Sequence, residues 1–287
     1  MIGKQPVPPR ILAQRGETAT ALGVDRKSTI SATDRPLPHE NKFAPLSLRS
    51  FAAIPYRIFM KIEIFADAQT VAEEAAKLIA SEARSATAER GRFVFAVSGG
   101  HTPWIMLRAL AKHDVPWDKV HLAQVDERVA PAGDPDRNLT HLQESLLEHA
   151  PLPPNQIYAM PVESNDLESG AKEYAKVLEK IAGSPPVFDL VHLGLGPDGH
   201  TASLVPGDPV LQINDADVGV TGIYQSRRRM TLTYPVLNRG RRVLWLMTGK
   251  DKVEMLKRLS KGDPTIPAGR VNQERALVFA DREATGG

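Results

Sequence analysis

A histidine and an aspartate stand two positions apart in a turn that follows an apolar run. Residues 187–193 have the character of a strand, residues 194–199 read GLGPDG, and His200 and Thr201 come next, where a helix would begin. Histidine is the side chain best suited to general-base chemistry near neutral pH, and the carboxylate of Asp198 could orient its ring. Ligands bind at the carboxyl ends of strands in parallel α/β sheets. We therefore expect His200 to be a catalytic base with Asp198 beside it; a histidine that only caps a helix is the alternative.

The same turn matches the dinucleotide-binding pattern G-x-G-x-x-G through Gly194, Gly196 and Gly199. That pattern needs a long helix whose N-terminus points at the pyrophosphate. Here Pro206 and Pro209 would end any helix after about two turns. Four predicted strands with helices also precede the strand before this turn, whereas the pattern usually lies in the first βαβ unit. The sequence therefore argues against a dinucleotide cofactor.

A second glycine-rich segment, SGGHTP at residues 98–103, lies between a predicted strand and a predicted helix. Such a loop can hold phosphate, because glycines let backbone N–H groups converge and the helix N-terminus adds partial positive charge. The expected contacts are the backbone of Gly99 and Gly100 and the hydroxyls of Ser98 and Thr102. No Gly-Lys-Ser/Thr follows, so this is not a Walker loop. An ordinary strand-to-helix turn is the alternative.

Charged residues are dense after a third predicted strand, at Asp126, Glu127 and Arg128. Such density is typical of the rim where ligands bind, although a solvated turn would show the same pattern. Asp126 is a further candidate catalytic carboxylate. A phosphate dianion is held better by two or three cations than by one. The candidate cations are Arg128, Arg229, Lys252 and Arg270.

The elements that must position these residues alternate between strand and helix. Strand patterns lie at residues 61–65, 92–97, 119–125, 157–160, 187–193, 230–233, 242–247 and 276–280. Helical patterns lie at residues 67–90, 104–110, 138–147, 166–181 and 251–259, with Asp67 and Asn138 as expected N-caps and a turn or short helix at 234–238. This alternation predicts an α/β protein with a mostly parallel sheet covered by helices on both faces.

The composition limits the classes of protein that need to be considered. The 287 residues include no cysteine, which excludes disulfides and thiolate catalysis and suits a reducing compartment such as the cytoplasm. No run approaches the ~18 apolar residues of a transmembrane helix, and the first residues lack the apolar core of a secretory signal. No pair of histidines and no histidine–carboxylate cluster has metal-ligand spacing, so no metal site is expected.

Residues 1–59 differ from the rest of the chain. They hold nine Lys/Arg and four Asp/Glu, so this segment carries +5 while the whole chain carries +2. The basic balance therefore gives no reason to expect nucleic-acid binding by the remainder. Seven prolines and no sustained period predict a disordered extension, followed by a single domain at 60–287. A transit peptide, a binding tail and translation upstream of the true start are all open, and the strand directly after Met60 favours the last.

Six motifs in order resemble the 6-phosphogluconolactonase family of the pentose phosphate pathway, over nearly all of residues 60–282. The motifs are SGGHTP (98–103), VDER (125–128) with RNLT (137–140), HLGLGPDGHTASLVPG (192–207), RMTLTYPVLN (229–238), TGKDK (248–252) and PAGRV (267–271). The resemblance implies a Rossmann-like three-layer α/β/α fold and hydrolysis of 6-phosphoglucono-δ-lactone without metal or cofactor. The chain departs from the usual family pattern at two positions. The family commonly has Ser or Asn where this chain has His101, and Phe where it has Val205.

The nearest rival is a sugar-phosphate isomerase or deaminase of the same superfamily. In the deaminases of this superfamily, the corresponding motif has a carboxylate five residues after the histidine, whereas this chain has Val205 at that position. A proton transfer between sugar carbons needs a carboxylate-type base, whereas an activated ester needs a base for water and a group that stabilises the oxyanion. The substitution favours the lactonase. A non-enzymatic sugar-phosphate-binding domain is a third alternative, although residues 1–59 show no helix-turn-helix pattern. The oligomeric state stays open, and a monomer is compatible with the sequence.

Overall fold

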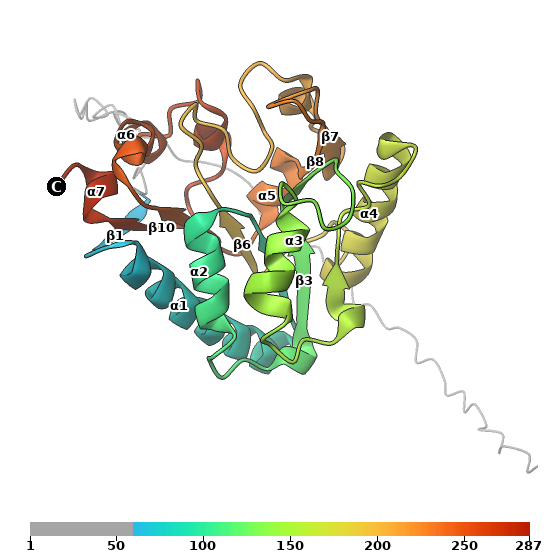
Figure 1. Cartoon of the computed structure of the whole chain (residues 1–287), viewed down its shortest axis with the longest axis horizontal. Coiled ribbons are helices and arrows are strands. Elements are labelled where there is room, and N and C mark those ends of the chain that lie inside the picture. The colour runs from blue at the N-terminus through green and yellow to red at the C-terminus, as the bar shows by residue number, and fades with distance from the viewer. Residues whose placement is uncertain (1–59) are drawn as a thin grey trace, which may run out of the picture. The chain divides into compact units, whose positions relative to one another are not determined.

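The computed structural model describes residues 60–287, so the expectations for residues 1–59 lie outside the described part. Its main sheet has seven strands in the order β1-β10-β9-β6-β2-β3-β5, and every neighbouring pair is parallel. The strands are β1 (Lys61–Phe65), β2 (Phe93–Val97), β3 (Val120–Gln124), β5 (Ile157–Tyr158), β6 (Leu190–Leu193), β9 (Val243–Met247) and β10 (Ala276–Asp281). The predicted Rossmann-like α/β fold is confirmed (Figure 1).

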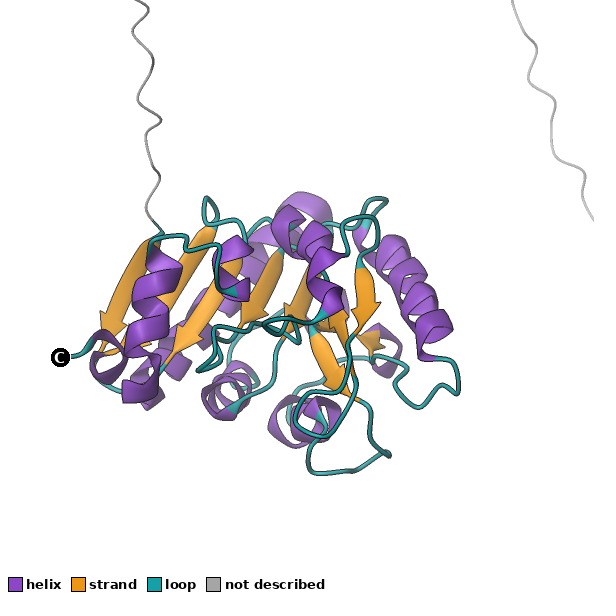
Figure 2. Ribbon diagram, turned by 90° about the horizontal axis from the view of Figure 1, so that it is seen from above, coloured by secondary structure: helices purple, strands orange, loops and turns teal. Residues whose placement is uncertain are grey.

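Helices cover both faces of this sheet (Figure 2). They are α1 (Ala68–Arg90), α2 (His101–Leu110), α3 (Asn138–Leu142), α4 (Leu167–Ala182), α5 (Tyr234–Arg239), α6 (Val253–Ser260) and α7 (Arg282–Thr285). Alternate residues of β2 point to opposite faces, as a strand requires. Phe93 and Phe95 belong to the core under α1 and α2, while Val94 and Ala96 belong to the core under α4 and α5. Each face therefore has its own apolar core.

Local signals in the sequence explain the best-predicted helix. Asp67 accepts a hydrogen bond from the backbone N–H of Thr70 at 2.8 Å, which caps the start of α1. Gly91 ends the helix in the left-handed conformation, with φ of 74°. Alanines dominate the buried face of α1, so the helix can approach the sheet closely. Among the described residues no helix is long and apolar enough to cross a membrane.

A second, antiparallel sheet was not predicted. It consists of β4 (Asp126–Arg128), β8 (Arg229–Leu232) and β7 (Val218–Val220), in the order β4-β8-β7. The charged side chains of β4 hid its strand character. Its pairing depends on residues about one hundred positions away, which no local pattern reveals. This sheet carries two of the predicted cations to the carboxyl edge of the main sheet.

The helix expected to begin at His200 does not form. The backbone N–H of Gly196 donates to the carbonyl oxygen of His200 at 2.8 Å, so the chain closes a loop on itself. Ala202 then adopts φ of 51°, which a helix cannot continue through. A short 3-10 turn at Pro209–Gln212 is the next regular element. The prolines thus exclude a long helix, as predicted, and the closed loop excludes even a short one.

Candidate active site

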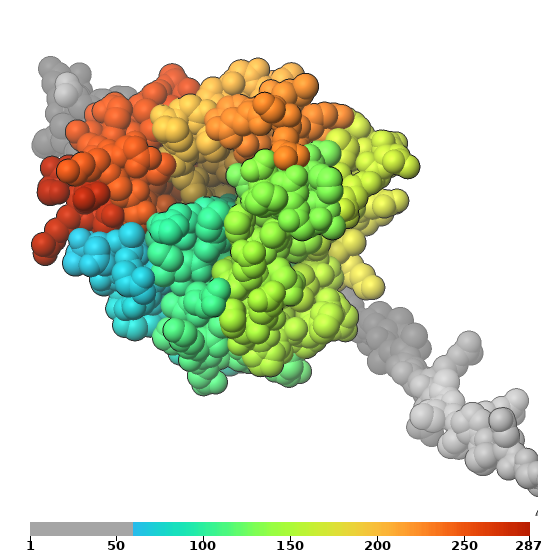
Figure 3. Space-filling model, viewed as in Figure 1, coloured from blue at the N-terminus to red at the C-terminus, as the bar shows by residue number. Residues whose placement is uncertain are grey.

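A cavity of about 500 Å³ opens at the carboxyl ends of β2 and β6, which are neighbours in the main sheet. The chain leaves β2 and β6 toward opposite halves of the sheet, and such a switch point is where α/β proteins bind ligands. Figure 3 shows this face of the molecule, with the teal atoms of α2 beside orange and red atoms from the C-terminal third. Ten of the eleven residues predicted for the site lie at this cavity or contact a residue that lines it. They are Ser98, Gly99, Gly100, Thr102, Asp126, Arg128, Asp198, His200, Arg229 and Lys252.

His200 lines the cavity, and one side of its ring is held by Asp198. Nδ1 of His200 lies 2.5 Å from Oδ1 of Asp198, and the same oxygen accepts the backbone N–H of His200 at 3.1 Å. Burial raises the pKa of Asp198, but hydrogen bonds and the charge from His200 outweigh it and hold that pKa below its usual value. An ionised Asp198 requires the proton on Nδ1. Nε2 of neutral His200 is then an acceptor, as a general base needs.

Gly196 makes room for the imidazole ring. A Cβ atom on Gly196 would lie 2.1 Å from Nδ1 of His200 and 2.8 Å from Oδ1 of Asp198. No side chain fits there, so the glycine at this position serves the histidine–aspartate pair. The glycines of the turn are thus explained by close approach to His200, with no need for a dinucleotide.

The loop at residues 98–102 places several polar groups at the cavity. The hydroxyl of Ser98 is buried and has no hydrogen-bond partner among the described residues. The backbone N–H of Ser98 donates to Nδ1 of buried His192 at 3.3 Å, and the hydroxyl of Thr102 lies 2.7 Å from that of Thr248. The loop enters the ten-residue helix α2, whose first N–H groups have no intrahelical acceptor. These donors suit an oxyanion.

Two arginines form the cationic side of the cavity. Arg128 and Arg229 face each other across β4 and β8, and Lys252 also lines the cavity. Arg229 is only 4% exposed, and its Nε has no hydrogen-bond partner in the described part of the chain. Burial lowers the pKa of Arg229, and the charge of Arg128 lowers it further. Lys252 is already paired with Asp251 at 2.7 Å. Of these three cations, the two arginines are therefore the ones without a carboxylate partner among the described residues.

Asp126 is a buried carboxylate at the wall of the cavity. Its Oδ2 accepts the hydroxyl of Ser203 at 2.6 Å, and its Oδ1 lies 3.4 Å from the side-chain amide of Asn138. These neutral donors hold the carboxylate without neutralising it. Asp126 can therefore position a substrate hydroxyl or a water molecule.

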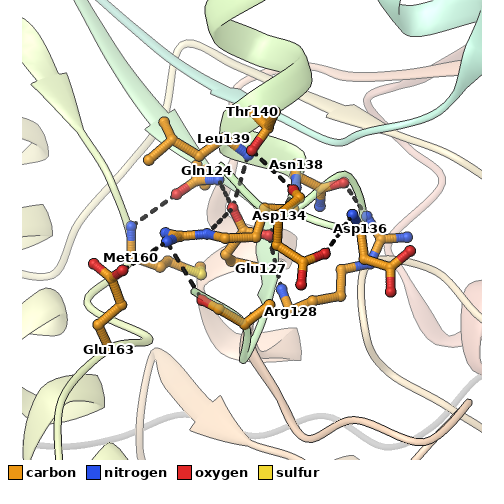
Figure 4. A network of polar contacts seen from close by, with 12 residues as sticks. Gln124, Glu127, Arg128, Asp134, Asp136, Asn138, Leu139, Thr140, Met160 and Glu163 are labelled. Atoms are coloured by element: carbon orange, nitrogen blue, oxygen red, sulfur yellow. Dashed lines mark hydrogen bonds and ion pairs between the residues drawn. The ribbon is translucent and has the colours of Figure 1, made fainter. Parts of the chain in front are cut away.

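Glu127, for which the sequence predicted no role, anchors the backbone of Arg128 and Asn138 (Figure 4). Fully buried, it accepts the backbone N–H groups of Arg128, Asn138 and Leu139, each at 2.8 Å, and the side-chain amide of Gln124. It thereby caps α3. Asn138, expected as the N-cap, instead donates to the carbonyl of Asp126 at 2.9 Å and accepts from the guanidinium of Arg128. A Cβ on Gly99 would lie 2.0 Å from Oδ1 of Asn138, so this network also packs closely against the glycine-rich loop at 98–102.

Arg270 does not join the cations of this cavity. Its guanidinium stacks on the ring of Tyr234 at 4.4 Å and donates to the carbonyl of Leu211 at 3.0 Å, in a separate pocket of about 210 Å³. The preceding 3-10 turn Pro267–Arg270 aims the side chain there. Arg270 therefore does not line the cavity that holds the other predicted cations. Conversely, Tyr224 contacts the site but belongs to no motif, and Thr248 begins the TGKDK motif but was not assigned to the site. No cluster of three metal-ligating side chains occurs within residues 60–287.

The fold and the site together define a Rossmann-like α/β protein in which a glycine-rich loop and a histidine–aspartate pair lie at one cavity. A profile of the family described as glucosamine-6-phosphate isomerases/6-phosphogluconolactonase matches residues 66–279. The chain belongs to this family. It is 34% identical over 226 residues to a 6-phosphogluconolactonase of Synechocystis, covering 76% of this chain and 94% of that protein. It is 36% identical over 237 residues to a 6-phosphogluconolactonase of Mycobacterium tuberculosis, covering 78% and 96%.

Solved structures agree with this assignment. A 6-phosphogluconolactonase of Thermotoga maritima superposes with a TM-score of 0.69 at 27% identity, covering 77% of this chain and 99% of that chain. A monomeric glucosamine-6-phosphate deaminase superposes with a TM-score of 0.70 at 19% identity, covering 79% and 99%. The second likeness concerns the fold alone. The shared fold leaves the choice between the two chemistries to the residues of the site.

Proposed function

We propose that this chain is a 6-phosphogluconolactonase, which hydrolyses 6-phosphoglucono-δ-lactone to 6-phosphogluconate. The observation that carries the proposal is the placement of the His200–Asp198 pair at a cavity whose wall also holds Arg128 and Arg229, neither of them ion-paired with a described carboxylate. A general base and a separate group of cations in one cavity suit a substrate that carries a reactive carbonyl at one end and a phosphate at the other. The curated relatives above carry the same name. The cysteine-free composition supports a cytoplasmic location.

The phosphate would bind at the loop of residues 98–102. The hydroxyls of Ser98 and Thr102 and the first N–H groups of α2 supply donors, and Arg128, Arg229 and Lys252 supply charge. Several charge-assisted hydrogen bonds of this kind fix the position of a dianion. The lactone ring would then extend toward His200 within the cavity.

Hydrolysis then needs one base and one oxyanion site. Nε2 of His200 takes a proton from water while the water oxygen attacks the lactone carbonyl carbon. Backbone N–H groups or an arginine of the cavity stabilise the tetrahedral oxyanion. As the oxyanion collapses, the bond from that carbon to the ring oxygen breaks, and protonated His200 returns its proton to the departing oxygen. Asp198 stabilises the imidazolium that exists between these two steps.

An isomerase or deaminase of the same family is the second candidate. The observation that keeps it is Asp126, a carboxylate that lines the cavity. Against it, the position five residues after His200 is Val205, which is buried in the core and offers no base. The full 287-residue protein should be given fresh 6-phosphogluconolactone in a pH-stat, with glucosamine 6-phosphate and an aldose phosphate tested in parallel. Proton release from the lactone well above its spontaneous rate supports the proposal. Ammonia or ketose formation without lactone hydrolysis would overturn it.

A further inference from the structure

Tyr224 lies at the end of a tight hairpin that leans on the catalytic pair. It forms an isolated antiparallel bridge with Arg227, with N–H···O distances of 2.9 and 3.3 Å. The two tip residues, Gln225 and Ser226, have φ values of 50° and 68°. Two-residue hairpins of this kind favour Asn and Gly, and other residues at positive φ cost of the order of 1 kcal/mol each. Such strain persists where surrounding contacts hold the turn in place.

Those contacts run through the tyrosine side chain. The Tyr224 hydroxyl donates to Oδ2 of Asp198 at 3.0 Å, while Oδ1 of the same carboxylate holds His200. The Tyr224 ring and the imidazole of His200 are in a T-shaped contact, with centroids 5.6 Å apart and planes at 67°. The guanidinium of Arg229 lies over the tyrosine ring at 4.9 Å. One side chain therefore contacts the aspartate, the histidine and a cation of the anion site.

The two parts of this side chain have separable tasks. With both oxygens of Asp198 engaged, the carboxylate cannot rotate away from Nδ1 of His200. The ring gives the guanidinium of Arg229 a surface to stack on, together with a hydrogen bond from that guanidinium to Gln225 at 2.9 Å. The hydroxyl should thus affect the chemical step, and the ring should affect the binding of the anion.

We propose that Tyr224 is a positioning residue that fixes Asp198, and through it His200, by its hydroxyl, and supports Arg229 by its ring. This inference rests on the proposed role of His200 as general base. It extends the histidine–aspartate pair to a third residue, which lies in a loop between β7 and β8 and outside the six motifs of the family resemblance. A carboxylate that holds the catalytic tautomer works best when it is itself held.

Two substitutions separate the hydroxyl from the ring. Tyr224→Phe keeps the ring and should lower kcat about tenfold with little change in KM, since a hydrogen bond to a charged group is lost. Tyr224→Leu removes both and should raise KM as well. Tyr158→Phe is the matched control, because the Tyr158 hydroxyl likewise has a side-chain hydrogen-bond partner, Nδ1 of His121 at 2.9 Å, and neither Tyr158 nor His121 lines the cavity. It should leave kcat and KM unchanged.

Two further readouts test the route through Asp198. In an Asp198→Ala background, Tyr224→Phe should have no additional effect on kcat; an undiminished tenfold loss there would overturn the proposal. The Nδ1 proton of His200, assigned by NMR through its loss in His200→Ala, should shift in Tyr224→Phe and stay in place in Tyr158→Phe. An unmoved signal in Tyr224→Phe would also overturn it. This NMR comparison needs no turnover, so it decides the role of Tyr224 even if the wild type proves inactive on the lactone.

Discussion

Arg128 and Arg229 occupy directly opposite positions in the antiparallel pair formed by β4 and β8. Like charges placed opposite each other destabilise a sheet, and neither guanidinium has a carboxylate within ion-pair distance among the described residues. Burial and the neighbouring charge hold the pKa of Arg229 below its usual value. The fold therefore keeps an arrangement that becomes favourable when an anion lies between the two side chains.

Replacing Arg229 should weaken binding of the substrate and increase the stability of the ligand-free protein. Arg229→Met removes a buried, poorly paired charge, so we expect the free energy of unfolding without ligand to rise by about 1 kcal/mol. The KM for the lactone should rise about ten- to a hundredfold, because charge-assisted hydrogen bonds to phosphate are lost. Inorganic phosphate should raise the Tm of the wild type and not of this variant. Arg241→Met, at a surface arginine 52% exposed, is the control, and equal KM values in the two variants would refute the assignment.

His200→Ala should lose most of the lactonase activity while binding of 6-phosphogluconate persists. General-base catalysis contributes about a hundred- to ten-thousandfold, and the contacts proposed between the phosphate and the loop at 98–102 do not involve this imidazole. Rates are measured by proton release and binding of the product by calorimetry. His149→Ala, at an exposed histidine that does not line the cavity, controls for the loss of a histidine. Near-normal turnover in His200→Ala would remove His200 from the mechanism.

Gly196→Ala should inactivate the protein by displacement of the ring. The added methyl group would lie 2.1 Å from Nδ1 of His200, so the imidazole must move away from Asp198. We expect kcat to fall at least about a hundredfold, as for loss of the base itself, while the Tm changes little. Gly194→Ala, where a Cβ meets no atom within 4 Å, should retain a much larger share of the activity. Similar losses in both variants would mean that the turn, and not the space for the ring, is what matters.

The arrangement of the cavity residues could be predicted from the sequence where one short segment supplies all of the residues concerned. The loop at 98–102 and the Asp198–His200 turn each lie within one motif. In each case the strand, the glycines that follow it and the polar side chains are adjacent in the sequence, so their proximity in space could be predicted. The partnership of Arg128 with Arg229 depends on pairing between segments far apart in the chain, which local patterns do not encode. The position of Arg270 outside this cavity could not be predicted either, because a basic residue in a motif does not reveal which pocket its side chain enters.

Glu127→Gln should destabilise the whole domain. The carboxylate of Glu127 is fully buried and accepts three backbone N–H groups, and it lies 3.7 Å from Arg137, which is itself only 3% exposed. Neutralising it leaves buried Arg137 with only Glu163, a 57% exposed side chain 3.3 Å away, as its carboxylate partner among the described residues, and it removes the charged acceptor of three backbone N–H groups. Loss of one partner of a buried charge pair costs about 3–5 kcal/mol. Urea denaturation measures the loss. Glu144→Gln, at a side chain 61% exposed, should change the stability by less than about 0.5 kcal/mol. A loss below about 1 kcal/mol in Glu127→Gln would contradict the buried-network account.

His192 should make the fold sensitive to mild acid. The ring is fully buried in β6, and burial lowers its pKa to about 3 from an ordinary value of 6.5. Below about pH 6.5, His192 therefore binds a proton in the unfolded chain but not in the folded chain. The free energy of unfolding has its full value above that pH and falls as the pH drops toward 3. The expected slope is up to about 1.4 kcal/mol per pH unit.

The slope attributable to His192 can be isolated between about pH 6.5 and 5, where ordinary carboxylates stay ionised. His192→Leu should lower stability at pH 7.5, because the N–H of Ser98 loses its acceptor, yet its stability should fall less steeply on acidification than that of the wild type. His121, whose pKa burial also lowers, is present in both proteins, so its contribution cancels in the comparison. Urea denaturation at half-unit pH steps measures both curves. Parallel curves would show that His192 accepts a proton in the folded protein, against the burial seen in β6.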